Sequence, residues 1–221
     1  MHATILRELE SIEELSDRVG TAISIFGSAR IKPGHEIFTL THQIASRLSN
    51  EGYTVISGGG PGIMRAANEG ARTGKTHTIG FNVVLPFEPA DFQFQDVSLV
   101  FENFFTRKIA FCKHSHAFIA MPGGMGTLDE LFEILTLMQT KKIAPMPVVL
   151  VGSQFWGGLV DWMRTNLEAA NLISAGELDD IKVIDDADSV VNYLKQRVPI
   201  PAASITPPSS IRPVTRQSDG S

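Results

Sequence analysis

We predict an α/β fold in which helices cover both faces of a doubly wound, mostly parallel sheet. Short apolar runs of strand length alternate along the chain with longer segments whose apolar residues recur at helical spacing. Such alternation implies right-handed crossover connections, which pair the strands in parallel and place the helices on both faces. A chain of 221 residues is long enough for one well-buried domain and short for two.

The chain divides into three predicted parts. Residues 1–20 have the pattern of a polar amphipathic helix, an appendage that packs on the domain or on a partner subunit. The domain itself is predicted over 21–197. Residues 198–221 form a Pro/Ser-rich tail without apolar periodicity, which we expect to be disordered because it cannot bury enough apolar surface. Within the domain, strands are predicted at 21–26, 53–57, 76–81, 97–101, 117–120, 146–151 and 181–184, and helices at 34–50, 63–73, 103–115, 128–138, 155–170 and 187–196.

Three glycine-bearing turns follow strands of this sheet: 27–28, 58–62 and 123–126. The carboxyl ends of parallel strands share one edge, so we expect the three turns to meet there. Glycines allow close approach of the backbone, and a helix start offers unpaired N–H groups to an anion. The sequence therefore predicts a phosphate-binding turn at Gly124, Gly126 and Thr127. The full set of candidate substrate contacts in and beside the turns is Gly27, Ser28, Gly59, Gly60, Met64, Pro122, Gly123, Gly124, Met125, Gly126 and Thr127.

Two common nucleotide motifs fail on spacing. The segment 58–63 lacks the third glycine of a dinucleotide-binding fingerprint, and Asn82 stands where that motif needs an acidic residue. Residues 74–76 resemble the end of a P-loop, but Glu69 replaces the required glycine. A bound monophosphate, without a dinucleotide or triphosphate, fits the turns better.

Glu130 is the first candidate for chemistry, and its spacing supports two interpretations. Thr127 and Glu130 match a capping box, in which the glutamate merely satisfies the helix start. At helical spacing, Gly126, Thr127, Glu130 and Glu133 also share a face away from the leucine stripe, which would aim a carboxylate across the ligand crevice. Spacing alone leaves both interpretations open.

The helix predicted at 103–115 contributes basic residues. We expect Phe105, Ile109 and Cys112 to form its buried stripe. Arg107 and Lys108 stand among the phenylalanines, where two adjacent basic side chains suggest a crevice lining that faces phosphate or a carboxylate. The alternative is that each extends into water, as single basic residues usually do.

Composition and charge exclude several classes of binding partner. A net charge of −5 without a polybasic patch gives no reason to expect nucleic acid, and no apolar run reaches the roughly 18 residues of a membrane span. The single Cys112 suits a reducing cytoplasm. His114 and His116 lack further ligands at familiar spacing, so no metal site is expected.

Three segments together resemble the LOG ("lonely guy") family: 57–64 (SGGGPGIM), Arg107-Lys108, and 122–130 (PGGMGTLDE). The last matches the family's P-G-G-x-G-T-x-x-E signature in full, and the resemblance runs from about Ile23 to Leu194.

The resemblance implies a Rossmann-like fold and a hydrolase that splits nucleoside 5′-monophosphates, cytokinin riboside monophosphates or AMP, into free base and ribose 5-phosphate. It implies Arg107 and Glu130 as the catalytic pair, Lys108 as a further substrate contact, and neither a metal nor an organic cofactor. Phe104–Thr106 departs from the common pattern and leaves base preference open. The resemblance also implies a homodimer or homohexamer. Related sequences are often labelled lysine decarboxylases, yet no lysine here has a pyridoxal-phosphate setting. A non-catalytic nucleotide-binding module is the alternative.

Overall fold

The computed structural model, which describes residues 2–85 and 91–201, contains a seven-stranded sheet in the order β4-β3-β2-β1-β5-β6-β7. Every neighbouring pair of strands is parallel. All seven predicted strands are confirmed within a few residues: β1 (Ala22–Phe26), β2 (Thr54–Ser57), β3 (Thr78–Val83), β4 (Val97–Phe101), β5 (Ser115–Ala120), β6 (Val148–Val151) and β7 (Ile181–Ile184).

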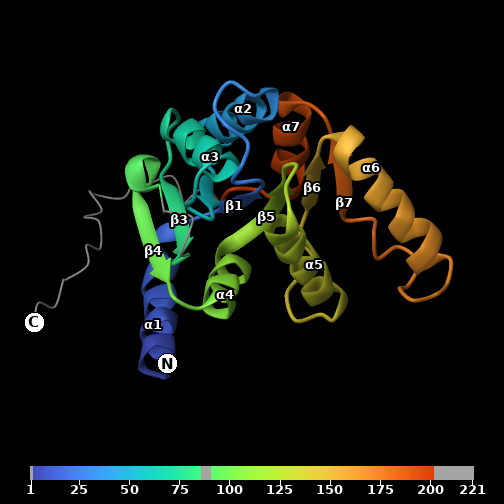
Figure 1. Ribbon diagram of the computed structural model, residues 1–221, viewed down its shortest axis with the longest axis horizontal. Helices are drawn as coiled ribbons and strands as arrows, with labels where there is room; N and C mark the ends of the chain where they lie inside the picture. The colour runs from blue at the N-terminus through green and yellow to red at the C-terminus, as the bar shows by residue number, and fades with distance from the viewer. Residues whose placement is uncertain (1, 86–90, 202–221) are drawn as a thin grey trace, which may run out of the picture.

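Helices cover the sheet on both faces, as predicted (Figure 1). Residues of α2 (Glu36–Asn50), α3 (Ile63–Arg72) and α7 (Ala187–Arg197) share one core with the sheet. The other face is packed by α1 (His2–Val19), α4 (Phe104–His114), α5 (Met125–Gln139) and α6 (Ser153–Trp162), the last continuing into a π-helical segment, Met163–Glu168. A short 3₁₀ helix, Phe92–Phe94, precedes β4.

The central strands are apolar on both sides because both sides are covered. Every residue of β1, β2 and β6 is buried, which explains their continuous rather than alternating apolar patterns. The strand order reverses direction between β1 and β5, since β2, β3 and β4 follow on one side and β6 and β7 on the other. A crevice at the carboxyl ends of β1 and β5 is the expected ligand site of such a sheet.

The N-terminal helix packs on the domain itself. Ile12, Leu15 and Val19 of α1 are buried in the core beside α4. At the other end, Val198 is also buried and its carbonyl accepts a 2.6 Å hydrogen bond from the Tyr53 hydroxyl. The ordered packing therefore extends past 197, where the sequence placed the start of the tail; residues 202–221 lie outside the described part. None of the described helices is both long and apolar enough to cross a bilayer.

The buried side of α4 differs from the prediction. Thr106, Ala110 and Phe111 face the core, whereas Phe105 and Ile109 are 50% and 44% exposed. The apolar residues of α4 are spread around the whole helix, so their spacing in the sequence did not show which face is buried. The contacts with α1 and β3 decide which side is covered.

Candidate active site

Backbone hydrogen bonds join the three glycine turns at the carboxyl edge of the sheet. The Ser28 N–H donates to Pro122 O at 3.1 Å, and the Ile63 N–H donates to Ser28 O at 3.0 Å. Gly62 has a φ of +68°, and a Cβ there would overlap the backbone of Ser28 and Ala29. The predicted convergence of the turns is therefore confirmed.

A cavity of about 640 Å³ lies between these turns, within the usual size range for small-molecule sites. Most predicted contacts line it, including both members of the expected catalytic pair: Gly27, Ser28, Gly59, Gly60, Met64, Arg107, Gly124, Met125, Gly126, Thr127 and Glu130. Lys108, Pro122 and Gly123 are not among the lining residues. Pro122 instead accepts the Ser28 hydrogen bond, and Gly123 packs against Thr127.

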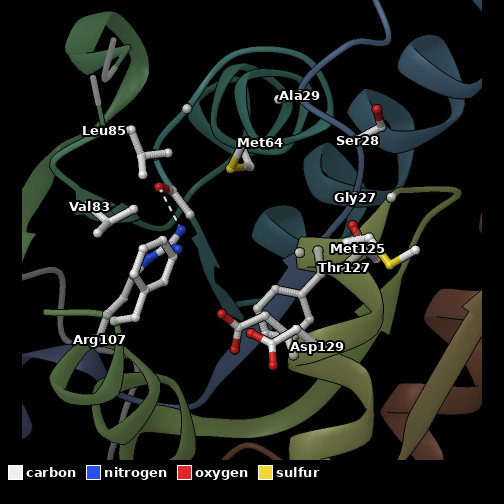
Figure 2. A pocket seen from close by; sticks show the side chains of 18 of the residues that line it. Gly27, Ser28, Ala29, Met64, Val83, Leu85, Arg107, Met125, Thr127 and Asp129 are labelled. Carbon is white, nitrogen blue, oxygen red and sulfur yellow. Dashed lines mark hydrogen bonds between the residues drawn. The ribbon is translucent and has the colours of Figure 1, made fainter. Parts of the chain in front are cut away.

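The cavity has two unlike walls (Figure 2). Val83, Leu85 and Arg107 stand on one side, Ser28, Met125 and Thr127 on the other. The cavity lining also includes Arg30, Asn82, Val83 and Leu85, which were not predicted from the sequence. Their positions follow from the topology that predicted the glycine turns, in which ligands bind at the carboxyl ends of parallel strands. Strand β3 also ends at this edge, and Arg30 is the last residue of the turn after β1.

Helix α5 begins beside the cavity, and its first backbone N–H groups are not used by hydrogen bonds within the helix. It begins at Met125, with Gly124 as N-cap and no side-chain cap; the first hydrogen bond within it runs from Leu128 N to Gly124 O at 3.1 Å. The N–H groups of residues 125–127 therefore have no helical acceptor. A Cβ at Gly124 or Gly126 would meet no protein atom within 4 Å, so these glycines leave open space rather than fit tight packing.

Glu130 does not cap this helix, so the capping-box interpretation is wrong. Thr127 lies inside the first turn rather than at the N-cap. Glu130 is 7% exposed and lies on the buried side of α5 with Leu131 and Ile134, not on a polar face opposite the leucines. Its Oε2 has no hydrogen-bond partner among the described residues. A buried carboxylate oxygen without a partner is costly in a structural role and is typical of a functional one.

The surroundings of Glu130 tune its acidity. Burial raises the pKa of the Glu130 carboxyl from 4.5 to about 7, because a charge is poorly solvated there. The positive charges of Arg107 and Lys108 oppose this rise, while Glu133 and Asp129 add to it. A carboxyl group that titrates near neutral pH is suited to acid–base chemistry.

Arg107 is held at the cavity wall by a carbonyl group of β3 and one of the turn after β2. Its Nε donates to Phe81 O at 2.7 Å and its Nη2 to Gly58 O at 3.1 Å, the latter at the end of β2. The guanidinium also lies over the ring of Phe111, 5.5 Å from its centroid. A Cβ on Gly58 would overlap Nη2, so this glycine makes room for the arginine.

Lys108 points between α4 and α5, and its ammonium does not line the cavity. Its Nζ forms ion pairs of 2.9 Å with Asp129 Oδ2 and with Glu133 Oε2. Burial alone would lower the pKa of Lys108, but these acceptors outweigh it and raise the pKa. Lys108 thus links α4 to α5 through these ion pairs. Helix α4 carries Arg107, and helix α5 carries Glu130.

Other reactive side chains lack the features of a site. Burial raises the pKa of Cys112 to about 11, and the residue packs against the core, so its thiol is not activated. Among residues 2–85 and 91–201, no group of three or more His, Cys, Asp and Glu side chains could hold a metal ion.

Several known proteins resemble this chain in sequence or in fold. A family profile described as "Possible lysine decarboxylase" matches residues 64–194. A cytokinin riboside 5′-monophosphate phosphoribohydrolase of Mycobacterium marinum is 30% identical over 72% of this chain and 86% of its own length. One from Arabidopsis thaliana is 38% identical over 66% of this chain and 67% of its own. A molybdenum cofactor carrier protein of Chlamydomonas reinhardtii shares the fold, with a TM-score of 0.60, 20% identity, and coverage of 80% of this chain and 98% of that one.

Proposed function

Because the chain belongs to the LOG family, together with these phosphoribohydrolases, we propose that it hydrolyses the N-glycosidic bond of nucleoside 5′-monophosphates. The products would be a free base and ribose 5-phosphate. Cytokinin riboside 5′-monophosphates and AMP are the substrates to test. One observation carries the proposal: the buried carboxylate of Glu130, whose Oε2 has no hydrogen-bond partner among the described residues, lines a cavity that Arg107 also lines.

The start of α5 supports binding of the 5′-phosphate. The free N–H groups of residues 125–127 and the positive end of the helix dipole favour an anion at this position. Gly124 and Gly126 leave it room, because no side chain occupies that space. The opposite wall carries Val83 and Leu85, which suit the flat apolar faces of a base.

Glu130 is placed to assist bond cleavage. As the bond between C1′ and the base nitrogen breaks, positive charge develops on the ribose ring, and an ionised carboxylate stabilises it. The same carboxylate accepts a proton from the water that attacks C1′, and the departing base takes up a proton in turn. Arg107 would orient the substrate and balance the charge of the carboxylate, whose pKa it lowers.

A panel of monophosphates, including AMP and N6-isopentenyladenosine monophosphate, tests the proposal by identification of the released base. We expect release by the unaltered protein, and binding without measurable turnover for Glu130→Gln. Exposed Glu14 provides a matched control, Glu14→Gln. Calorimetric binding without product from any member of the panel would instead favour the non-catalytic nucleotide-binding module.

Lysine decarboxylation fits the cavity poorly. A pyridoxal phosphate enzyme needs a lysine in its cavity for the Schiff base. The described lining residues include no lysine, and nearby Lys108 is paired with Asp129 and Glu133.

We also propose a homo-oligomer, dimer or hexamer, in which a second copy covers exposed apolar residues of α4 and α5. These are Phe105, Ile109, Met125 and Phe132, of which Met125 is 84% exposed and also lines the cavity. Light scattering should give a multiple of the chain mass, and Phe132→Glu should reduce it. Action in the cytoplasm remains a prediction from the single cysteine.

A further inference from the structure

Glu8 of α1 lies outside the segment that matches the family profile, yet it is the only acidic residue of α1 among those described that is buried. Its carboxylate accepts hydrogen bonds from Glu102 N at 2.6 Å, Asn103 Nδ2 at 3.0 Å and Thr106 Oγ1 at 2.5 Å. Glu8 is separated from these donors by more than 90 positions along the chain. The carboxylate therefore joins two distant elements.

These donors stand at the beginning of α4. Asn103 is the N-cap of α4, and its side chain makes no capping hydrogen bond of its own. A carboxylate at this end also interacts favourably with the helix dipole. Burial alone would raise the pKa of Glu8, but the hydrogen bonds from Thr106, Asn103 and the backbone lower it, so the ionised form is favoured.

A second set of contacts holds the other end of α4 to the same helix. His114 Nε2 lies 3.1 Å from Ile12 O. Because a carbonyl can only accept, this ring nitrogen must carry the proton. Lys113 forms an ion pair with Glu13. Helix α1 thus holds α4 at both ends.

Helix α4 carries Arg107, the residue after Thr106, and Phe104, which also lines the cavity. The contacts of the guanidinium include the carbonyl groups of Phe81 and Gly58 and the ring of Phe111. A displacement of about 1 Å in such a group can reduce turnover about 100-fold. The first turn of α4 sets the position of the backbone from which the Arg107 side chain extends to these contacts.

We propose that Glu8 is a positioning residue for Arg107, through its hydrogen bonds to the first turn of α4. The proposal rests on the hydrolase function proposed above. It makes the N-terminal helix part of the active-site scaffold rather than an appendage.

A double-mutant cycle separates positioning from general stability. Glu8→Ala should lower kcat about 10- to 100-fold in the unaltered protein and should cause no further loss in an Arg107→Ala background. The control Glu14→Ala removes an exposed glutamate from the same helix and should leave kcat unchanged in both backgrounds. Equal fractional losses from Glu8→Ala in both backgrounds would overturn the proposal.

Milder variants keep the test decisive if Glu8→Ala fails to fold. Thr106→Val removes one donor to Glu8 at nearly constant volume, and Thr106→Ser keeps the hydroxyl. We expect loss of kcat for the valine variant and nearly full activity for the serine variant. Equal activity of the two variants would count against the proposal.

Hydrogen exchange provides a readout that does not need turnover. Amides of residues 104–108 should exchange faster in Glu8→Ala than in Glu14→Ala. If the unaltered protein releases no base but this difference is observed, the function proposal fails while the coupling of Glu8 to α4 stands. Unchanged exchange at 104–108 would refute the coupling itself.

Discussion

Glu130→Gln should alter the way in which the free energy of unfolding depends on pH. The Glu130 carboxyl has a pKa of about 7 in the fold and an ordinary value of 4.5. One unit of pKa corresponds to about 1.4 kcal/mol, so the full difference corresponds to about 3 kcal/mol. The folded protein holds this proton more tightly than the unfolded chain, so the stabilising contribution is complete below pH 4.5 and is lost as the pH rises towards 7.

Glutamine does not titrate, so the variant lacks this loss. The free energy of unfolding of Glu130→Gln, relative to the unaltered protein, should therefore increase by about 2.5 kcal/mol between pH 5 and pH 8. Any fixed effect of the amide on packing appears equally at both pH values and cancels in this comparison.

Urea unfolding at four pH values from 5 to 8 measures the effect. Trp156 is buried, so its fluorescence should report the transition. Glu14→Gln is the control, because Glu14 is exposed on α1. A difference between Glu130→Gln and the unaltered protein that stays constant over this pH range would refute the argument that Glu130 buries a charge at neutral pH.

Three further predictions concern the cavity and the core. Gly126→Ala should raise the KM for monophosphates at least about tenfold, because the added methyl occupies the space proposed for phosphate. Tm should shift by no more than about 3 °C, because this methyl meets no protein atom within 4 Å. Steady-state kinetics that match those of the unaltered protein would contradict this prediction. Gly58→Ala should lower kcat about 100-fold, since the methyl overlaps the guanidinium of Arg107. The control is Gly157→Ala, because a Cβ at Gly157, unlike one at Gly58, meets no protein atom within 4 Å. Equal rates for the two variants would disprove the reasoning. Phe118→Ala should cost about 3–5 kcal/mol in urea unfolding, because Phe118 is 2% exposed and stacks on Phe26; a loss below about 1 kcal/mol would mean that the core collapses around the gap.

Local sequence patterns predicted the order of the strands and helices and the location of the cavity. Apolar runs and helical spacing predicted all seven strands, because a parallel sheet covered on both faces needs continuous apolar strands. Glycine turns after β1, β2 and β5 predicted their own convergence, since parallel strands end at one edge. The resemblance to the LOG family then implied Glu130 and Arg107 as a pair, and both line the same cavity.

Side-chain contacts could not be predicted from the sequence where several local arrangements were equally compatible with it. Helix α4 is apolar nearly all round, so its spacing could not show that Thr106 is buried while Phe105 is exposed. Lys108 has the same local pattern as Arg107, yet it pairs with Asp129 and Glu133 across to α5. The capping-box spacing of Glu130 was equally ambiguous until the helix start at Met125 was known.

The alternation of apolar segments and the glycine-rich turns, which are local properties of the chain, therefore decided the α/β sheet and the edge at which we propose that phosphate binds. Tertiary packing alone decided the chemistry of the groups at that edge. The raised pKa of Glu130 results from burial, and burial depends on which helices cover a residue. The hold of Glu8 on the start of α4 joins residues more than 90 positions apart, and no local pattern records such a contact.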